Sequence, residues 1–134
     1  PLAQANVNFL GGKITFDTLG NIKVVGNAEF AKDVSVGGVL SAKDIAVGRA
    51  DVPQIISDTE VIATGSSGLV MLLAGKTELK VNNEKATADS LIFVTPKTEA
   101  DLPIYIKTQS DGQFTVGIKV EQTYDTKFNF LIVN

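Results

Sequence analysis

A Val-Gly pair recurs at a constant interval in the first third of the chain, and this spacing constrains the fold more than any other feature. The pairs are Val25-Gly26, Val36-Gly37 and Val47-Gly48, so the interval is eleven positions. Lys32-Asp33 and Lys43-Asp44 keep the same spacing. A period of this length fits one short strand and one turn per repeat, because glycine tolerates the positive φ of a tight turn. The pattern therefore predicts a β-repeat with eleven-residue rungs.

Each rung holds a strand that is too short to bury its apolar side chains alone. Val34-x-Val36 and Ile45-x-Val47 alternate as strands do, and an earlier, less regular copy spans residues 14–22. So few rungs make a thin single-chain solenoid, whereas identical chains side by side supply the missing apolar partners. An ordinary β-meander with coincidental glycine spacing stays open as the alternative. We expect interchain packing by the valines of the three pairs: Val25, Val36 and Val47.

Strand signals dominate the chain from residue 69 onward. Residues 69–73 and 91–94 are continuous apolar runs, as buried strands are, and residues 114–120 alternate between apolar and polar. Strands at intervals of roughly ten residues are typical of an antiparallel sandwich. We therefore expect an all-β chain with a short-strand β-repeat stalk at 1–50, a linker at 51–68 and a jelly-roll-like antiparallel β-sandwich head at 69–134.

The closing segment of the sequence is apolar at nearly every position. Phe128, Phe130 and Ile132 alternate with Asn129, Leu131 and Val133. A strand with apolar residues on both faces is usually covered on both. We therefore expect one face of this strand to meet another chain, with Phe128, Phe130 and Ile132 in that contact.

Composition argues against most kinds of active site. The sequence contains no His, Cys or Trp, which removes imidazole acid–base catalysis, thiol nucleophiles and the usual zinc ligands. Ser66 and Ser67 lie in no nucleophile-elbow motif, and the paired carboxylates form no calcium-loop motif. We therefore expect no enzyme activity, no catalytic residue, no metal and no cofactor.

Charge and hydropathy restrict the partners. The net charge is −3. The sequence has no cluster of basic residues with aromatic residues among them, which is the pattern of a nucleic-acid-binding surface. No run of about 18 apolar residues predicts a transmembrane span. Tyr124 beside Asp125, in an expected loop, combines an aromatic face with a carboxylate, as sugar-binding surfaces do. These two residues are the candidate ligand-binding site.

Two stretches resemble known fibre proteins. Gly26-Asn27 and residues 36–42 (Val-Gly-Gly-Val-Leu-Ser-Ala) match the pattern G-N-x-x-V-G-G-x-L-x-A, which is similar to stalks of trimeric phage-tail and bacterial surface fibres. Residues 93–96 (Phe-Val-Thr-Pro) and the closing strand look like a small C-terminal β-domain of bacterial surface proteins. That domain commonly carries paired Trp where this chain has Phe130 and Leu131.

The resemblance and the repeat together lead to one expected function and two alternatives. We expect a non-enzymatic structural segment of an extracellular, cell-surface or virion fibre, assembled as a homotrimer through interchain β contacts. Its head would cap the assembly or face a glycan or receptor. One alternative is a filament subunit that polymerises head to tail by donating the strand near residues 7–16. The other alternative is a monomeric carbohydrate-binding module.

Overall fold

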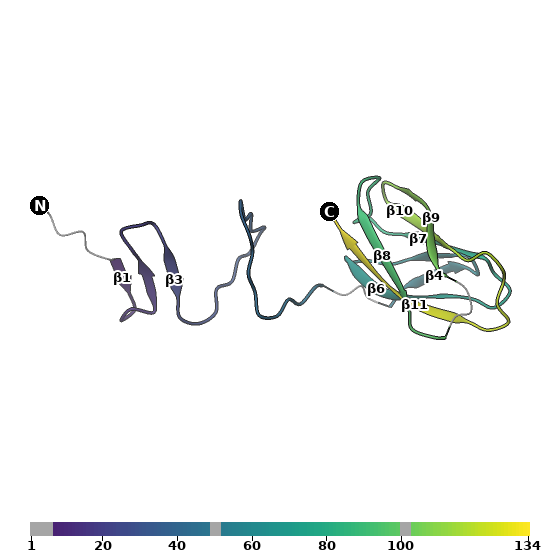
Figure 1. Cartoon of the computed structure of the whole chain (residues 1–134), viewed down its shortest axis with the longest axis horizontal. Coiled ribbons are helices and arrows are strands. Elements are labelled where there is room, and N and C mark those ends of the chain that lie inside the picture. Colours follow the sequence, from purple (N-terminus) through teal and green to yellow (C-terminus); the bar gives the residue numbers. More distant parts are fainter. Residues whose placement is uncertain (1–6, 49–51, 100–102) are drawn as a thin grey trace, which may run out of the picture. The chain divides into compact units, whose positions relative to one another are not determined.

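The computed structural model describes residues 7–48, 52–99 and 103–134 (Figure 1). These residues form strands, turns and extended segments without a helix, so the expected all-β class is confirmed. The chain consists of two compact units, Pro1–Lys43 and Asp44–Asn134. We call the second one the sandwich unit and describe each unit by itself.

The first unit contains a small antiparallel sheet. Its strands are β1 (Val7–Phe9), β2 (Ile14–Phe16) and β3 (Ile22–Val24), in the order β1-β2-β3. The phenyl rings of Phe9 and Phe16 meet edge to face with 6.0 Å between their centroids. Both rings remain at least partly in water, because the described residues of this unit form no second layer over the three-stranded sheet.

The turn between β2 and β3 is held by one carboxylate. Asp17 Oδ1 accepts hydrogen bonds from the backbone N–H groups of Leu19 (2.8 Å) and Asn21 (2.9 Å), and the side-chain amide of Asn21 donates to Oδ2 at 2.7 Å. These bonds favour the charged carboxylate and lower the pKa of Asp17, with the Asn21 side chain as the largest cause. Gly20 takes φ +84°, which this tight turn requires.

The chain between β3 and the sandwich unit's first strand differs from the expected rungs. Residues 27–48 form neither strand nor helix, so the short strands expected at 34–36 and 45–47 are not formed within the single chain. Gly37, Gly38 and Gly48 also lack the positive φ expected of tight turns. A strand of three residues gains its hydrogen bonds only from a neighbour, and the described residues of this chain provide none here.

The sandwich unit consists of two sheets. Five strands follow the order β4-β5-β7-β10-β9, and three follow the order β6-β11-β8. All neighbours are antiparallel except β5 and β7, which run parallel. The strands are β4 (Gln54–Ser57), β5 (Glu60–Ile62), β6 (Ser67–Leu72), β7 (Glu78–Asn82), β8 (Leu91–Pro96), β9 (Tyr105–Ser110), β10 (Gln113–Gly117) and β11 (Thr126–Val133).

The core is formed by the inward-facing residues of both sheets. Burial alternates along β6, β7, β10 and β11, as it does where one face of each sheet is covered. The rings of Phe114 on β10 and Phe130 on β11 meet edge to face at 5.6 Å, so an aromatic pair joins the two sheets. The largest fully buried side chains are Phe114, Phe128, Phe130, Leu72, Leu79, Val81, Val116 and Thr126.

The stretch expected as a linker, 51–68, contributes to the sheets. It contains β4 and β5 and the start of β6. Glu60, Val61 and Ile62 of β5 pair in register with Lys80, Val81 and Asn82 of β7. Within this pair Val61 is buried, because β5 lies beside a central strand of the sheet.

Candidate functional site

The valines of the eleven-residue repeat are exposed in the single chain. Val25, Val36 and Val47 have 57%, 47% and 49% of their surface in water. Soluble monomers rarely expose so many apolar side chains in a short stretch. The apolar surface that interchain packing would need is therefore present. Other large apolar side chains exposed between them are Phe30, Val34, Val39, Leu40 and Ile45.

The inward-facing side chains of the closing strand do not provide the interchain contact expected of them. Phe128, Phe130 and Ile132 are buried in the core of their own sandwich unit, so they have almost no surface for another chain. The reason is that β11 is the central strand of its sheet, between β6 and β8, and turns these three side chains toward the other sheet. We correct their role from interchain to intrachain packing.

Tyr124 and Asp125 lie in one hollow at the base of β11. Among the described residues its lining also includes Thr98 and Glu99, and the hollow has a volume of about 590 Å³. The Oδ1 atom of Asp125 accepts a hydrogen bond from the backbone N–H of Ala74 at 2.9 Å. Asp125 therefore holds the loop in place with one oxygen, and the half-exposed Tyr124 ring forms part of the wall.

The sequence did not indicate Thr98 and Glu99 as part of this hollow. They follow β8, and the antiparallel pairing of β8 with β11 brings them to the start of β11. Thr98 Oγ1 accepts a hydrogen bond from the backbone N–H of Lys127 at 3.0 Å, which fixes this approach. A prediction that the strands 91–94 and 128–133 pair would have found them, because antiparallel partners bring opposite ends together.

An apolar groove opens at one edge of the sandwich. Its volume is about 230 Å³, and its walls come from β4 and β5 on one side and β6 on the other. The three-stranded sheet ends at β6, whereas the five-stranded sheet continues to β4. Part of the inward face of β4 is therefore uncovered. Apolar residues that line the groove include Ile55, Val61, Leu69, Met71 and Leu73.

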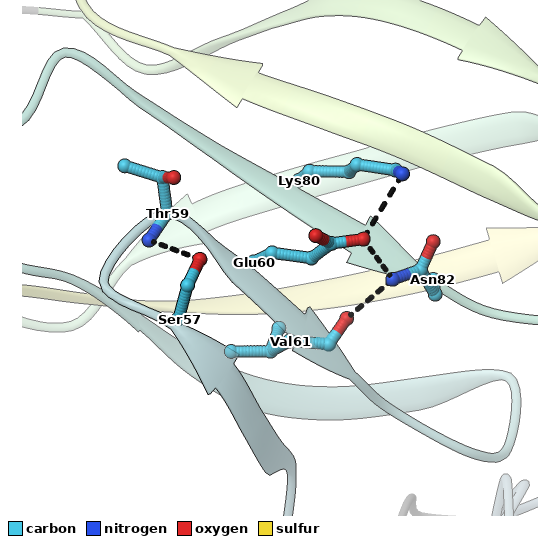
Figure 2. A network of polar contacts seen from close by, with 6 residues as sticks. All are labelled: Ser57, Thr59, Glu60, Val61, Lys80 and Asn82. Atoms are coloured by element: carbon cyan, nitrogen blue, oxygen red, sulfur yellow. Dashed lines mark hydrogen bonds and ion pairs between the residues drawn. The ribbon is translucent and has the colours of Figure 1, made fainter.

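A network of polar contacts joins β5 and β7 of the five-stranded sheet (Figure 2). Glu60 Oε1 receives a hydrogen bond from the Asn82 side-chain amide at 2.9 Å and pairs with the Lys80 ammonium at 3.0 Å. These donors, Asn82 first, lower the pKa of the Glu60 carboxyl. On the same sheet Lys107 pairs with Glu78, which raises the pKa of Lys107. Such neutralised pairs stabilise an exposed sheet surface modestly.

Comparison with known protein families, curated proteins and solved structures found no match for this sequence. Within residues 7–48, 52–99 and 103–134, no three acidic, His or Cys side chains gather as a metal-binding group. Over the same ranges, no helix is long and apolar enough to cross a membrane.

Proposed function

We propose that this chain is a non-enzymatic structural segment of an extracellular fibre and that three copies associate through the repeat at residues 25–48. The single observation that carries the proposal is the exposure of Val25, Val36 and Val47 at a constant spacing along the sequence. The resemblance to trimeric fibres supplies the number three. In this proposal the sandwich unit caps the fibre or faces a receptor on a cell or virion surface.

Energetics support association at the repeat. Complete burial of a valine side chain stabilises by about 1.5–3 kcal/mol, and each chain offers several half-exposed apolar side chains here. Unpaired backbone groups in residues 27–48 would also gain strand partners from neighbouring chains. Apolar burial at one rung alone stabilises the assembly too little to offset the conformational entropy lost when the chain becomes ordered. Repeated rungs add their contributions.

The experiment is to determine the mass of the full chain in solution by light scattering over a range of concentrations. We expect a mass near three chains. Substitution of Val25, Val36 and Val47 together by Asn should convert this species to a monomer, because it removes apolar burial at every rung. The matched control is Lys32→Asn with Lys43→Asn, which changes polar residues at the same spacing and should leave the mass unchanged. A monomeric wild-type chain would overturn the proposal.

A second candidate function is a filament subunit that accepts a strand from the next copy. The observation that favours it is the apolar groove beside β6, because an added strand at this edge would cover Ile55 and the neighbouring part of the core. The proposed donor is residues 7–16, which would have to leave its own small sheet. Deletion of residues 1–16 should abolish polymers seen by electron microscopy, and a closed trimer that survives the deletion would contradict strand donation.

The hollow beside Tyr124 is the place on the sandwich unit that we propose for contact with a glycan. Its aromatic wall and two carboxylates can stack on a sugar ring and accept hydrogen bonds from hydroxyl groups. A glycan array with the full chain tests this, and Tyr124→Ala should remove any binding found. Tyr105→Ala is the matched control, since Tyr105 is similarly exposed on β9 outside the hollow. Equal loss in both variants would argue against the hollow.

A further inference from the structure

The outer face of the three-stranded sheet is apolar at one end. Leu131 on β11 is the register partner of Phe93 on β8, and Val133 is the partner of Leu91. Antiparallel partners point to the same side, and the buried Ile132 between them points inward, so these four side chains point outward. Leu91 and Phe93 are 62% and 56% exposed. We call these four residues the β8–β11 patch.

The opposite surface of the sandwich unit has a different character. On the five-stranded sheet, Lys80 lies beside Glu60 and Thr115, and Asn82 lies beside Gln113. An outward face that only meets water has this polar composition. The β8–β11 patch has the composition of a covered face instead, although the described residues of the single chain leave it exposed.

We infer that the β8–β11 patch binds a second copy of this chain, as a self-association surface of the sandwich unit separate from the repeat. The inference rests on the proposed association of chains side by side. Neutrality along the strand register favours a like copy: the register neighbours Ser67, Thr95 and Asn129 carry no charge, so two copies bring no like charges together at these positions. This contrasts with the charged residues on the other sheet.

The small area of the patch also favours a second copy that is already joined to the first chain through the repeat. Four partly exposed side chains offer on the order of 300 Å² of apolar surface, whereas a standard stable interface takes about 800 Å² from each partner. A free partner would therefore bind weakly. Chains joined through the repeat have a high effective concentration of one another's sandwich units, and under that condition a small apolar contact forms.

The shape of the patch points to a flat partner surface. Neither the groove beside β6 nor the hollow beside Tyr124 includes any of its four residues. A small ligand on an open sheet face would stay largely in water, while a sheet face of another sandwich unit can cover it at the usual packing distance of about 10 Å.

The absence of Trp from the sequence gives a direct test. Phe93→Trp places a single indole in the patch, and Leu131→Trp serves as a second probe if the first perturbs folding. Thr108→Trp is the matched control, because Thr108 is exposed and pairs with Thr115 on the polar sheet. For each full-length variant, emission wavelength and acrylamide quenching would be measured together with the mass by light scattering.

In the associated protein we expect the patch indole to emit at shorter wavelength and to be quenched at least threefold less than the control indole. Added Asn substitutions at Val25, Val36 and Val47 should restore full quenching by producing monomers. If the protein is multimeric and both indoles are quenched alike, the patch contact is overturned while the proposed function stands. If the wild-type chain is monomeric, the proposed function and the patch contact are both overturned.

Discussion

Ile55 and Val61 are direct partners across β4 and β5 and share the inward face of the sheet, yet Ile55 is 75% exposed and Val61 is 6% exposed. The difference arises because the opposing three-stranded sheet ends at β6 and does not extend over β4. The boundary between core and solvent therefore runs between two paired residues.

This boundary predicts unequal effects of two similar substitutions. Val61→Ala should lower the free energy of unfolding by about 2 kcal/mol, because it removes buried methyl groups and leaves a small cavity. Ile55→Ala should change it by less than about 0.5 kcal/mol, as surface substitutions usually do. Urea denaturation of each variant measures both values. A loss from Ile55→Ala as large as that from Val61→Ala would mean that Ile55 is covered in solution.

Asn83 provides a second prediction about stability. It is almost fully buried after β7; its side-chain amide donates to the Gly65 carbonyl at 2.9 Å, and its Oδ1 accepts from the Lys85 N–H at 2.9 Å. Asn83→Ala should cost about 1–3 kcal/mol, because it removes two hydrogen bonds of a buried side chain and leaves part-buried backbone groups of Gly65 and Lys85 without this partner. Asn129→Ala, at an exposed site on β11, is the control and should be nearly neutral in the same urea titration.

Alternation in the sequence was sufficient to predict the strands that carry the core. Residues 69–73, 91–94 and 128–133 were expected as strands and correspond to β6, β8 and β11, displaced or extended by one or two residues at their ends. Each has apolar residues at every second position or throughout, so burial by a second sheet follows from local pattern. The all-β sandwich could therefore be predicted.

Features that depend on distant pairing could not be predicted. β4 and β5 are three or four residues long, and the place of β5 in the sheet depends on its parallel contact with β7, which lies beyond β6 in the sequence. The same limit applies to Phe128, whose apolar side chain predicts burial without indicating which chain buries it. Thr98 and Glu99 join the Tyr124 hollow only because two strand ends meet.

Glu60 gives a prediction of pH dependence for the sandwich unit. The pKa of its carboxyl is lowered in the folded chain from the ordinary 4.5, chiefly by the hydrogen bond from Asn82. A lowered folded pKa means that the charged carboxylate stabilises the fold above the unfolded pKa, and that this contribution disappears as pH falls through the folded pKa. Glu60→Gln should therefore lower the urea midpoint at pH 7, and the difference from wild type should shrink below pH 4.5. A difference that is constant with pH would contradict the carboxylate's role.

Asp17 gives a prediction of pH dependence for the first unit. It concerns the turn between β2 and β3. Its pKa lies below the ordinary 3.8 because the charged carboxylate accepts hydrogen bonds from the Asn21 side chain and from backbone N–H groups of the turn. The turn should therefore be stable above pH 3.8 and open as pH falls further. An NMR titration of the Asp17 carboxyl carbon should give a midpoint that rises toward the ordinary value in Asn21→Ala. Asn27→Ala, outside the turn, should leave the midpoint unchanged. Equal midpoints in all three proteins would show that the Asn21 amide does not stabilise the carboxylate.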